Sequence, residues 1–121
     1  MSQPQIHTKA QVESVLAELG LSLPTPAKPV AAYIPTRRAG GLVYVSGQIP
    51  VVDGKLIAEG IVPTQVSEEE AQRCARRCIL NGLAAVFAGI EADEGIAQIV
   101  RIGCFVACTP DYTMHPKVAN G

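Results

Sequence analysis

The sequence VYVSGQIP at residues 43–50 begins as an apolar β-strand and ends in polar groups. Valine and tyrosine favour extended structure, but the hydroxyl of Ser46, the bare backbone of Gly47 and the amide of Gln48 follow without a charge or a turn. Two explanations are open. The polar side chains satisfy backbone groups beside a hairpin, or they face a ligand. The residues alone favour the first explanation.

A β-hairpin is expected directly after this stretch. Asp53-Gly54 stands between the apolar residues 49–51 and 56–58, and an Asp-Gly pair in such a setting is the strongest short-range hairpin signal. Upstream, Gly40-Gly41 is expected to turn the chain into a strand over residues 42–50.

Three segments carry helix signals. Thr8–Gln11 has the spacing of a capping box and predicts a helix over about residues 9–19. Ser67–Glu70 is a second capping box and predicts a helix over about 68–88. Residues 115–121 resemble a helix opening, because proline is favoured at the first helical position. The apolar face expected for the second helix is Ala71, Cys74, Ala75, Cys78, Ile79, Gly82, Leu83 and Val86.

Residues 96–108 are rich in Ile, Val and Phe and predict a long strand, with a further extended segment at 31–36. The order of hairpin, helix and strand predicts an α+β fold of two layers. Residues 1–29 are expected to form an N-terminal helix and a proline-rich connector, and residues 30–121 the core.

Length and charge narrow the class of protein. A chain of 121 residues is expected to be a single domain. Ten basic against eleven acidic residues give a net charge of −1 with no block of like charge, which indicates neither a nucleic-acid partner nor a membrane partner. Residues 1–8 lack the pattern of a secretory signal, so a cytoplasmic protein is expected.

Four cysteines form two C-x-x-x-C pairs, Cys74 with Cys78 and Cys104 with Cys108. Buried thiols that act as small hydrophobic side chains are expected, and a tetrahedral zinc site is the weaker alternative, because structural sites usually have tighter C-x-x-C spacing. No metal is therefore expected.

The chain carries more apolar surface than its helices can cover. With 48% hydrophobic residues, an oligomer or further residues are expected to cover the excess. Because a helix as short as 115–121 is marginal alone, we expect further residues to follow Gly121 in the intact protein.

Several stretches together resemble the YjgF/RidA family, in its longer branch with an N-terminal extension. They are LVYVSGQIP at residues 42–50, the hairpin, the Ser-capped helix, IVRIGCFV at 99–106, and Asp111-Tyr112 ahead of Asn120. The likeness runs in one consistent order over residues 30–121, which makes it more specific than any single motif.

The resemblance implies a chorismate-mutase-like fold assembled as a homotrimer, with ligand sites in clefts between subunits. It also implies a cofactor-independent hydrolase of the 2-iminobutanoate/2-iminopropanoate deaminase kind, which converts reactive 2-enamine and 2-imine acids into 2-keto acids and ammonia. A non-catalytic trimer that binds a small ligand or a partner is the alternative, and the family's ribonuclease or translation-inhibitor label is a weaker one, since the charge offers no phosphate-binding groove.

The resemblance assigns four substrate-binding residues: Tyr33, Ser46, Gly47 and Asn120. Ser46 would supply a hydroxyl, Gly47 would allow close approach of a ligand, and Tyr33 would wall the pocket. Tyr33 could instead be a packed aromatic with an exposed tip, and Asn120 a surface residue.

No catalytic residue is assigned, because the family's carboxylate-binding arginine and its acidic residue lie beyond the point where this sequence ends. Arg101 lies within an apolar segment and is expected to pair at a subunit contact. His7 and His115 stand near no recognisable Ser or Asp partner.

Overall fold

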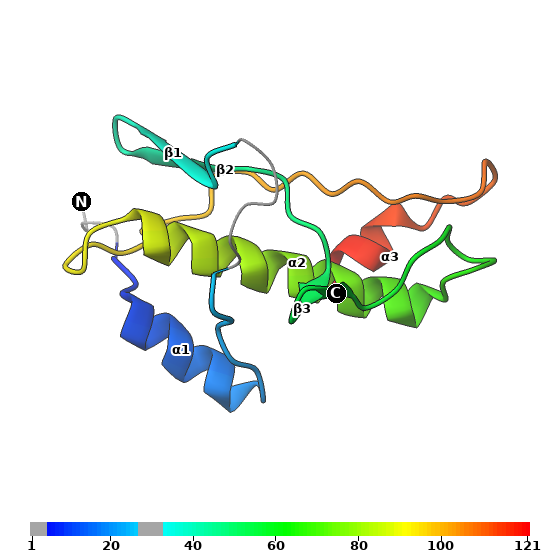
Figure 1. Cartoon of the computed structure of the whole chain (residues 1–121), viewed down its shortest axis with the longest axis horizontal. Helices are drawn as coiled ribbons and strands as arrows, with labels where there is room; N and C mark the ends of the chain where they lie inside the picture. Colours follow the sequence, from blue (N-terminus) through cyan, green and yellow to red (C-terminus); the bar gives the residue numbers. More distant parts are fainter. Residues whose placement is uncertain (1–4, 27–32) are drawn as a thin grey trace. The chain divides into compact units, whose positions relative to one another are not determined.

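Helices and two β-hairpins make up the described part of the chain, residues 5–26 and 33–121 of a computed structural model. The predicted α+β class is confirmed. The elements in chain order are α1 (Lys9–Glu18), β1 (Thr36–Ala39), β2 (Leu42–Val45), β3 (Val51–Val52), β4 (Lys55–Leu56), α2 (Glu68–Gly89) and α3 (His115–Ala119) (Figure 1). Contacts divide them into two compact units, the first within Met1–Gly47 and Leu80–Ile102, the second within Gln48–Ile79 and Gly103–Gly121.

The first unit opens with α1, and its predicted capping box is confirmed. The amide of Gln11 donates to the Thr8 hydroxyl at 3.3 Å, and the amide of Thr8 donates to the Gln11 side chain at 2.9 Å. These bonds satisfy backbone donors that the first helical turn leaves without partners. Leu16 is the buried residue of this helix.

An antiparallel hairpin, β1–β2, follows in the first unit, with Thr36 opposite Val45 and Ala39 opposite Leu42. Gly40 forms the turn at φ 60°, a conformation that glycine adopts without steric cost. Arg38 on β1 makes a two-pronged ion pair with Glu94, in which Nη1 donates to Oε1 at 2.7 Å and Nη2 to Oε2. This ion pair ties the hairpin to the segment that follows α2.

The second unit contains the hairpin predicted from Asp53-Gly54. β3 and β4 pair antiparallel, with Val51 opposite Leu56. Asp53 at φ 51° and Gly54 at φ 79° form the tight turn that this dipeptide favours. On α2, the guanidinium of Arg77 donates to the carbonyl of Val51 at 2.9 Å and so holds the hairpin to the helix.

The predicted capping box of α2 is also confirmed. The Glu70 amide donates to the Ser67 hydroxyl, and the Ser67 amide donates to the Glu70 carboxylate, both at 3.1 Å. The three glutamates of the first turn complement the helix dipole. No helix among the described residues is long and apolar enough to cross a membrane.

The short helix α3 is anchored by the core of the second unit. Val118 is 4% exposed and lies in a cluster with Val62, Val66 and Ala71. The Gln72 side chain donates to the Lys117 carbonyl at 2.8 Å, and Arg76 donates to the Gly121 carbonyl at 3.2 Å. Packing and these bonds hold a helix that would be marginal in isolation.

Two strand predictions need correction. The strand expected over residues 42–50 ends at Val45, and residues 46–50 join no ladder. The long strand expected over 96–108 is wrong: only isolated bridges mark its ends, His7 with Ile96 and Val62 with Cys108 (Figure 1). A strand exists only where a neighbouring backbone pairs with it, and composition does not supply that neighbour.

The expected apolar face of α2 is buried or half-buried along the helix except at Ile79, and it omits Leu80 and Ala84, which are buried as well. Ala71 is 5% exposed, but Ile79 is 39% exposed, whereas Leu80 and Ala84 are 6% and 2% exposed. In the first unit the segment Leu23–Pro26 approaches the helix at Ala84. The buried stripe of α2 is therefore wider than the predicted face.

Replacing Val118 by alanine should lower the free energy of unfolding by about 2 kcal/mol, because the methyl groups are lost from a filled core. The matched control is Val15→Ala on α1, where the valine is 56% exposed, and its effect should stay within about 0.5 kcal/mol. Urea unfolding measures both. Equal effects of the two substitutions would contradict the docking of α3.

The carboxyl of Glu94 should titrate far below the usual range. The hydrogen bond from Arg38 lowers its pKa from 4.5 to about 2, so this pair stabilises the fold above pH 4.5 and its contribution is lost as the pH falls toward 2. The carboxyl ¹³C shift of Glu94 measures the midpoint, and Arg38→Gln should return it toward the ordinary value. A wild-type midpoint near 4.5 would contradict the ion pair.

Candidate functional site

Ser46 stands at the end of β2 and connects it to the segment that precedes β1. Its amide donates to the Pro35 carbonyl at 2.9 Å, and its hydroxyl donates to the Ile34 carbonyl at 2.6 Å. The backbone-satisfying role considered from the sequence is therefore present. It does not exclude a ligand, because a hydroxyl that donates one hydrogen bond still has two acceptor lone pairs.

Gly47 is exposed, and the described residues give no steric reason for a glycine there. A Cβ added at Gly47 would meet no described atom within 4 Å, and its φ lies outside the left-handed region. Alanine could occupy this position without strain. A requirement for close approach by a ligand, the role that the family resemblance implies for Gly47, would explain the glycine.

Tyr33 belongs to the same unit and is 44% exposed. It directly precedes Ile34, whose carbonyl accepts the Ser46 hydroxyl. The Ser46 hydrogen bonds thus fix the chain at the residue next to Tyr33. The neighbouring residues Ala31 and Ala32, and residues 27–29 of the proline-rich connector, lie outside the described residues.

Asn120 belongs to the second unit, where it is exposed at the C-cap of α3. Its amide donates to the Pro116 carbonyl at 3.0 Å. The structure thus brings Ser46 to the segment of Tyr33 and holds Asn120 on an anchored helix. That all four residues line one cleft stays a prediction.

A polar network in the second unit surrounds α3. The Tyr112 hydroxyl donates to Glu68 Oε2 at 2.8 Å, and Lys117 Nζ lies 2.8 Å from Glu68 Oε1. Lys117, followed by Tyr112, lowers the pKa of Glu68, while partial burial followed by Glu68 raises the pKa of Tyr112 to about 12. Tyr112 therefore stays a neutral hydrogen-bond donor at ordinary pH.

One pair of side chains in this region was missed from the sequence. Cys108 Sγ lies 3.2 Å from Nε2 of His115. The sequence indicated no Ser or Asp partner for His115, and a cysteine seven positions before a histidine is not by itself a recognisable motif. Only the bridge of Cys108 to Val62 and the docking of α3 bring the two together.

The four cysteines were expected to be buried in the core, but none of them is fully buried. Cys74, Cys78 and Cys108 are half-buried, but Cys104 is exposed because its segment joins no sheet. All four are free thiols. Among the described residues, no group of three or more Cys, His, Asp or Glu side chains could hold a metal ion. Arg101, for which a pair at a subunit contact was expected, is exposed in the described structure.

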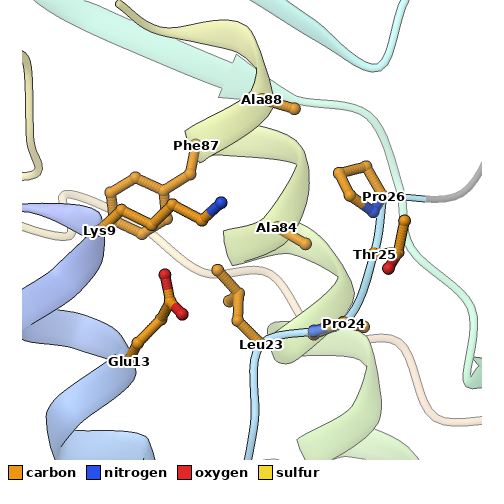
Figure 2. Close-up of a pocket in the computed structure, with 9 residues that line it drawn as sticks. All are labelled: Lys9, Glu13, Leu23, Pro24, Thr25, Pro26, Ala84, Phe87 and Ala88. Carbon is orange, nitrogen blue, oxygen red and sulfur yellow. The ribbon is translucent and has the colours of Figure 1, made fainter. Parts of the chain in front are cut away.

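A separate cavity of about 280 Å³ lies in the first unit between α1, residues 23–26 and the end of α2. Lys9 and Glu13 project from α1, and Phe87 lies opposite on α2 (Figure 2). None of the four predicted substrate-binding residues lines this cavity. It is therefore distinct from the candidate site at the end of β2.

Comparison with known proteins identifies the family. The chain is 30% identical over 111 residues to protein TCP17 of Trypanosoma cruzi, an alignment that covers 92% of this chain and 69% of TCP17. The chain belongs to the YjgF/RidA family. It is also 38% identical over 81 residues to the mitochondrial protein mmf1 of Schizosaccharomyces pombe, and spans 42% of that protein's length. No protein-family model matches the chain.

Solved structures confirm the YjgF-like fold. The protein Atu1372 of Agrobacterium tumefaciens, of unknown function, superposes with a TM-score of 0.74 at 36% identity, over 90% of this chain and 66% of that one. A candidate endoribonuclease from Shewanella oneidensis superposes with a TM-score of 0.70 over 89% of this chain and 72% of that one. Its 23% identity supports the shared fold alone.

Gly47→Ala should leave the stability of this YjgF/RidA chain within about 1 kcal/mol of wild type, because the added methyl group meets no atom and restricts the unfolded chain. Gly41→Ala is the matched control, since its surroundings are equally open. Thermal unfolding measures both. A large destabilisation by Gly47→Ala alone would show that the fold requires this glycine, which would remove the reason to connect it with a ligand.

Proposed function

We propose that this YjgF/RidA protein hydrolyses reactive 2-imine and 2-enamine acids to 2-keto acids and ammonia, without a cofactor. The observation that carries the proposal is the end of β2. There Ser46 is fixed by two hydrogen bonds to the segment after Tyr33, beside Gly47, where an added Cβ would meet no atom of the described residues. The family resemblance assigns this strand end to the ligand cleft.

The chemistry requires water to add to the C=N carbon, followed by expulsion of ammonia from the resulting carbinolamine. Because the Ser46 O–H is directed to the Ile34 carbonyl, its oxygen is suited to accept a hydrogen bond from the imine N–H. Tyr33 would wall the pocket, and the side-chain amide of Asn120 would bond the substrate. The cation for the substrate carboxylate and the acid–base group are not assigned to residues of this sequence.

We further propose that the chain works as a homotrimer with its sites between subunits. The supporting observation is the apolar segment around residues 99–105, whose backbone joins no ladder among the described residues. Val100 is 71% exposed, Ile102 is 63% exposed and Phe105 is fully exposed. Patches of this kind mark contact surfaces, and a second copy of the chain is the occupant that the family resemblance implies.

Cytoplasmic location is part of the same proposal, although the relative mmf1 is named a mitochondrial protein. Subcellular fractionation tests it. A ribonuclease activity has less support, because the candidate endoribonuclease shares the fold at only 23% identity and the net charge of −1 offers no phosphate-binding surface.

The test mixes the complete gene product with an enzyme that releases 2-aminoacrylate and follows the formation of pyruvate and ammonia. Acceleration is expected, and Ser46→Ala should reduce kcat/KM by on the order of 10-fold or more, the value of a hydrogen bond to a charged group. Ser14→Ala, an exposed serine on α1, should change nothing. Gly47→Ala should also reduce kcat/KM, while Gly41→Ala should not.

Three outcomes separate the alternatives. No acceleration at any protein concentration contradicts the deaminase proposal. Binding of a 2-keto acid without turnover contradicts it too, and supports the ligand-binding trimer instead. Turnover that neither Ser46→Ala nor Gly47→Ala reduces would support the deaminase activity but would show that its site is not at the end of β2.

A further inference from the structure

The contact between Cys108 and His115 has the geometry of an assisted nucleophile. Sγ and Nε2 are 3.2 Å apart, within the reach of a hydrogen bond to sulfur. In the neutral tautomer that carries its proton on Nδ1, Nε2 is the acceptor for the thiol proton. A thiol paired with an adjacent imidazole base is a recurrent way to activate sulfur.

Backbone hydrogen bonds of the two residues that flank Cys108 hold it in place. The Val62 amide donates to the Ala107 carbonyl, and the Thr109 amide donates to the Val62 carbonyl, both at 2.9 Å. These two bonds form the bridge that pairs Cys108 with Val62. The side chain is half-buried against the core cluster, so the position of its sulfur is restricted.

His115 is positioned independently from the other side. It begins α3, which Val118 anchors in the core. The ring of Tyr112 packs edge-on against the imidazole, with centroids 5.5 Å apart, and the Tyr112 hydroxyl is held by Glu68. The contact between sulfur and imidazole is therefore set by several elements of the unit rather than by one flexible side chain.

The remaining cysteines provide internal comparisons. Burial, followed by the nearby Cys74 and Cys104, raises the pKa of Cys78 to about 11, and burial also raises the pKa of Cys74. Both are expected to react slowly, because the thiolate is the nucleophile. Cys104 is exposed and so more accessible than Cys108.

We propose that Cys108, with His115 as its general base, is a covalent modification site for small soft carbon electrophiles such as α,β-unsaturated carbonyl compounds. Sulfur and activated alkenes are both soft, which favours this class. The site does not use the residues of the proposed deaminase function, and each proposal can fail without the other.

The reaction balances without a further reagent. An electron pair of Sγ forms the C–S bond at the β-carbon, and the thiol proton passes to Nε2 of His115. The displaced π electrons reach the α-carbon, which then takes the proton back from the imidazolium. With iodoacetamide as the probe, iodide leaves with its bonding pair and the proton is released to solvent.

The experiment treats the folded native protein with limiting iodoacetamide at neutral pH and measures each cysteine by peptide mass spectrometry. Cys108 should react several-fold faster than the more exposed Cys104, and Cys74 and Cys78 should react slowest. His115→Gln should slow Cys108 by on the order of 10-fold or more, with Cys104 as the unchanged internal control. Acrylamide should give the same order of rates.

His7→Gln tests whether the effect belongs to His115. It removes the other imidazole of the sequence, which is exposed in the first unit, so Cys108 should keep its rate. The proposal is overturned if Cys108 reacts no faster than Cys104 in the wild-type protein, a comparison that needs no variant. It is equally overturned if a folded His115→Gln protein, verified by circular dichroism, alkylates Cys108 at the wild-type rate.

Discussion

The hydrogen bond from the Ser46 hydroxyl to the Ile34 carbonyl, 2.6 Å long, is the interaction on which the proposed site depends. β2 ends at Val45, and this bond fixes the first of the polar residues that follow. Together with the bond from the Ser46 amide to Pro35, it joins the strand end to the segment that begins at Tyr33. A hydroxyl placed this way serves the fold and can still accept from a ligand.

Features governed by local chemistry could be predicted from the sequence. The capping boxes at Thr8 and Ser67 formed as expected, because the interacting atoms lie within three residues. The Asp53-Gly54 hairpin formed for the same reason, since only the turn residues decide it. The family assignment also followed from the sequence, because several local motifs occurred in one consistent order.

Features that require distant partners were predicted poorly. The apolar composition of residues 96–108 predicted a strand, but a strand needs a paired backbone, and only Ile96 and Cys108 form bridges there. The burial of Leu80 and Ala84, which lie outside the predicted face of α2, depends on the segments that pack on the helix. The contact of Cys108 with His115 arises from the bridge to Val62 and from the docking of α3. The sequence signals the helix itself but neither of these long-range contacts. The polar end of β2 was predicted, but the Ile34 carbonyl was not predicted as the acceptor of the Ser46 hydroxyl.

The central claim is that the end of β2 receives the substrate. The most direct measurement is a backbone-amide NMR titration of the complete gene product with 2-oxobutanoate, a stable keto acid of the proposed product class. The account predicts saturable shifts at the amides of Tyr33, Ser46 and Gly47, with those of α1 unchanged as the reference. Saturable shifts confined to other parts of the chain, with these three amides unmoved, would contradict it.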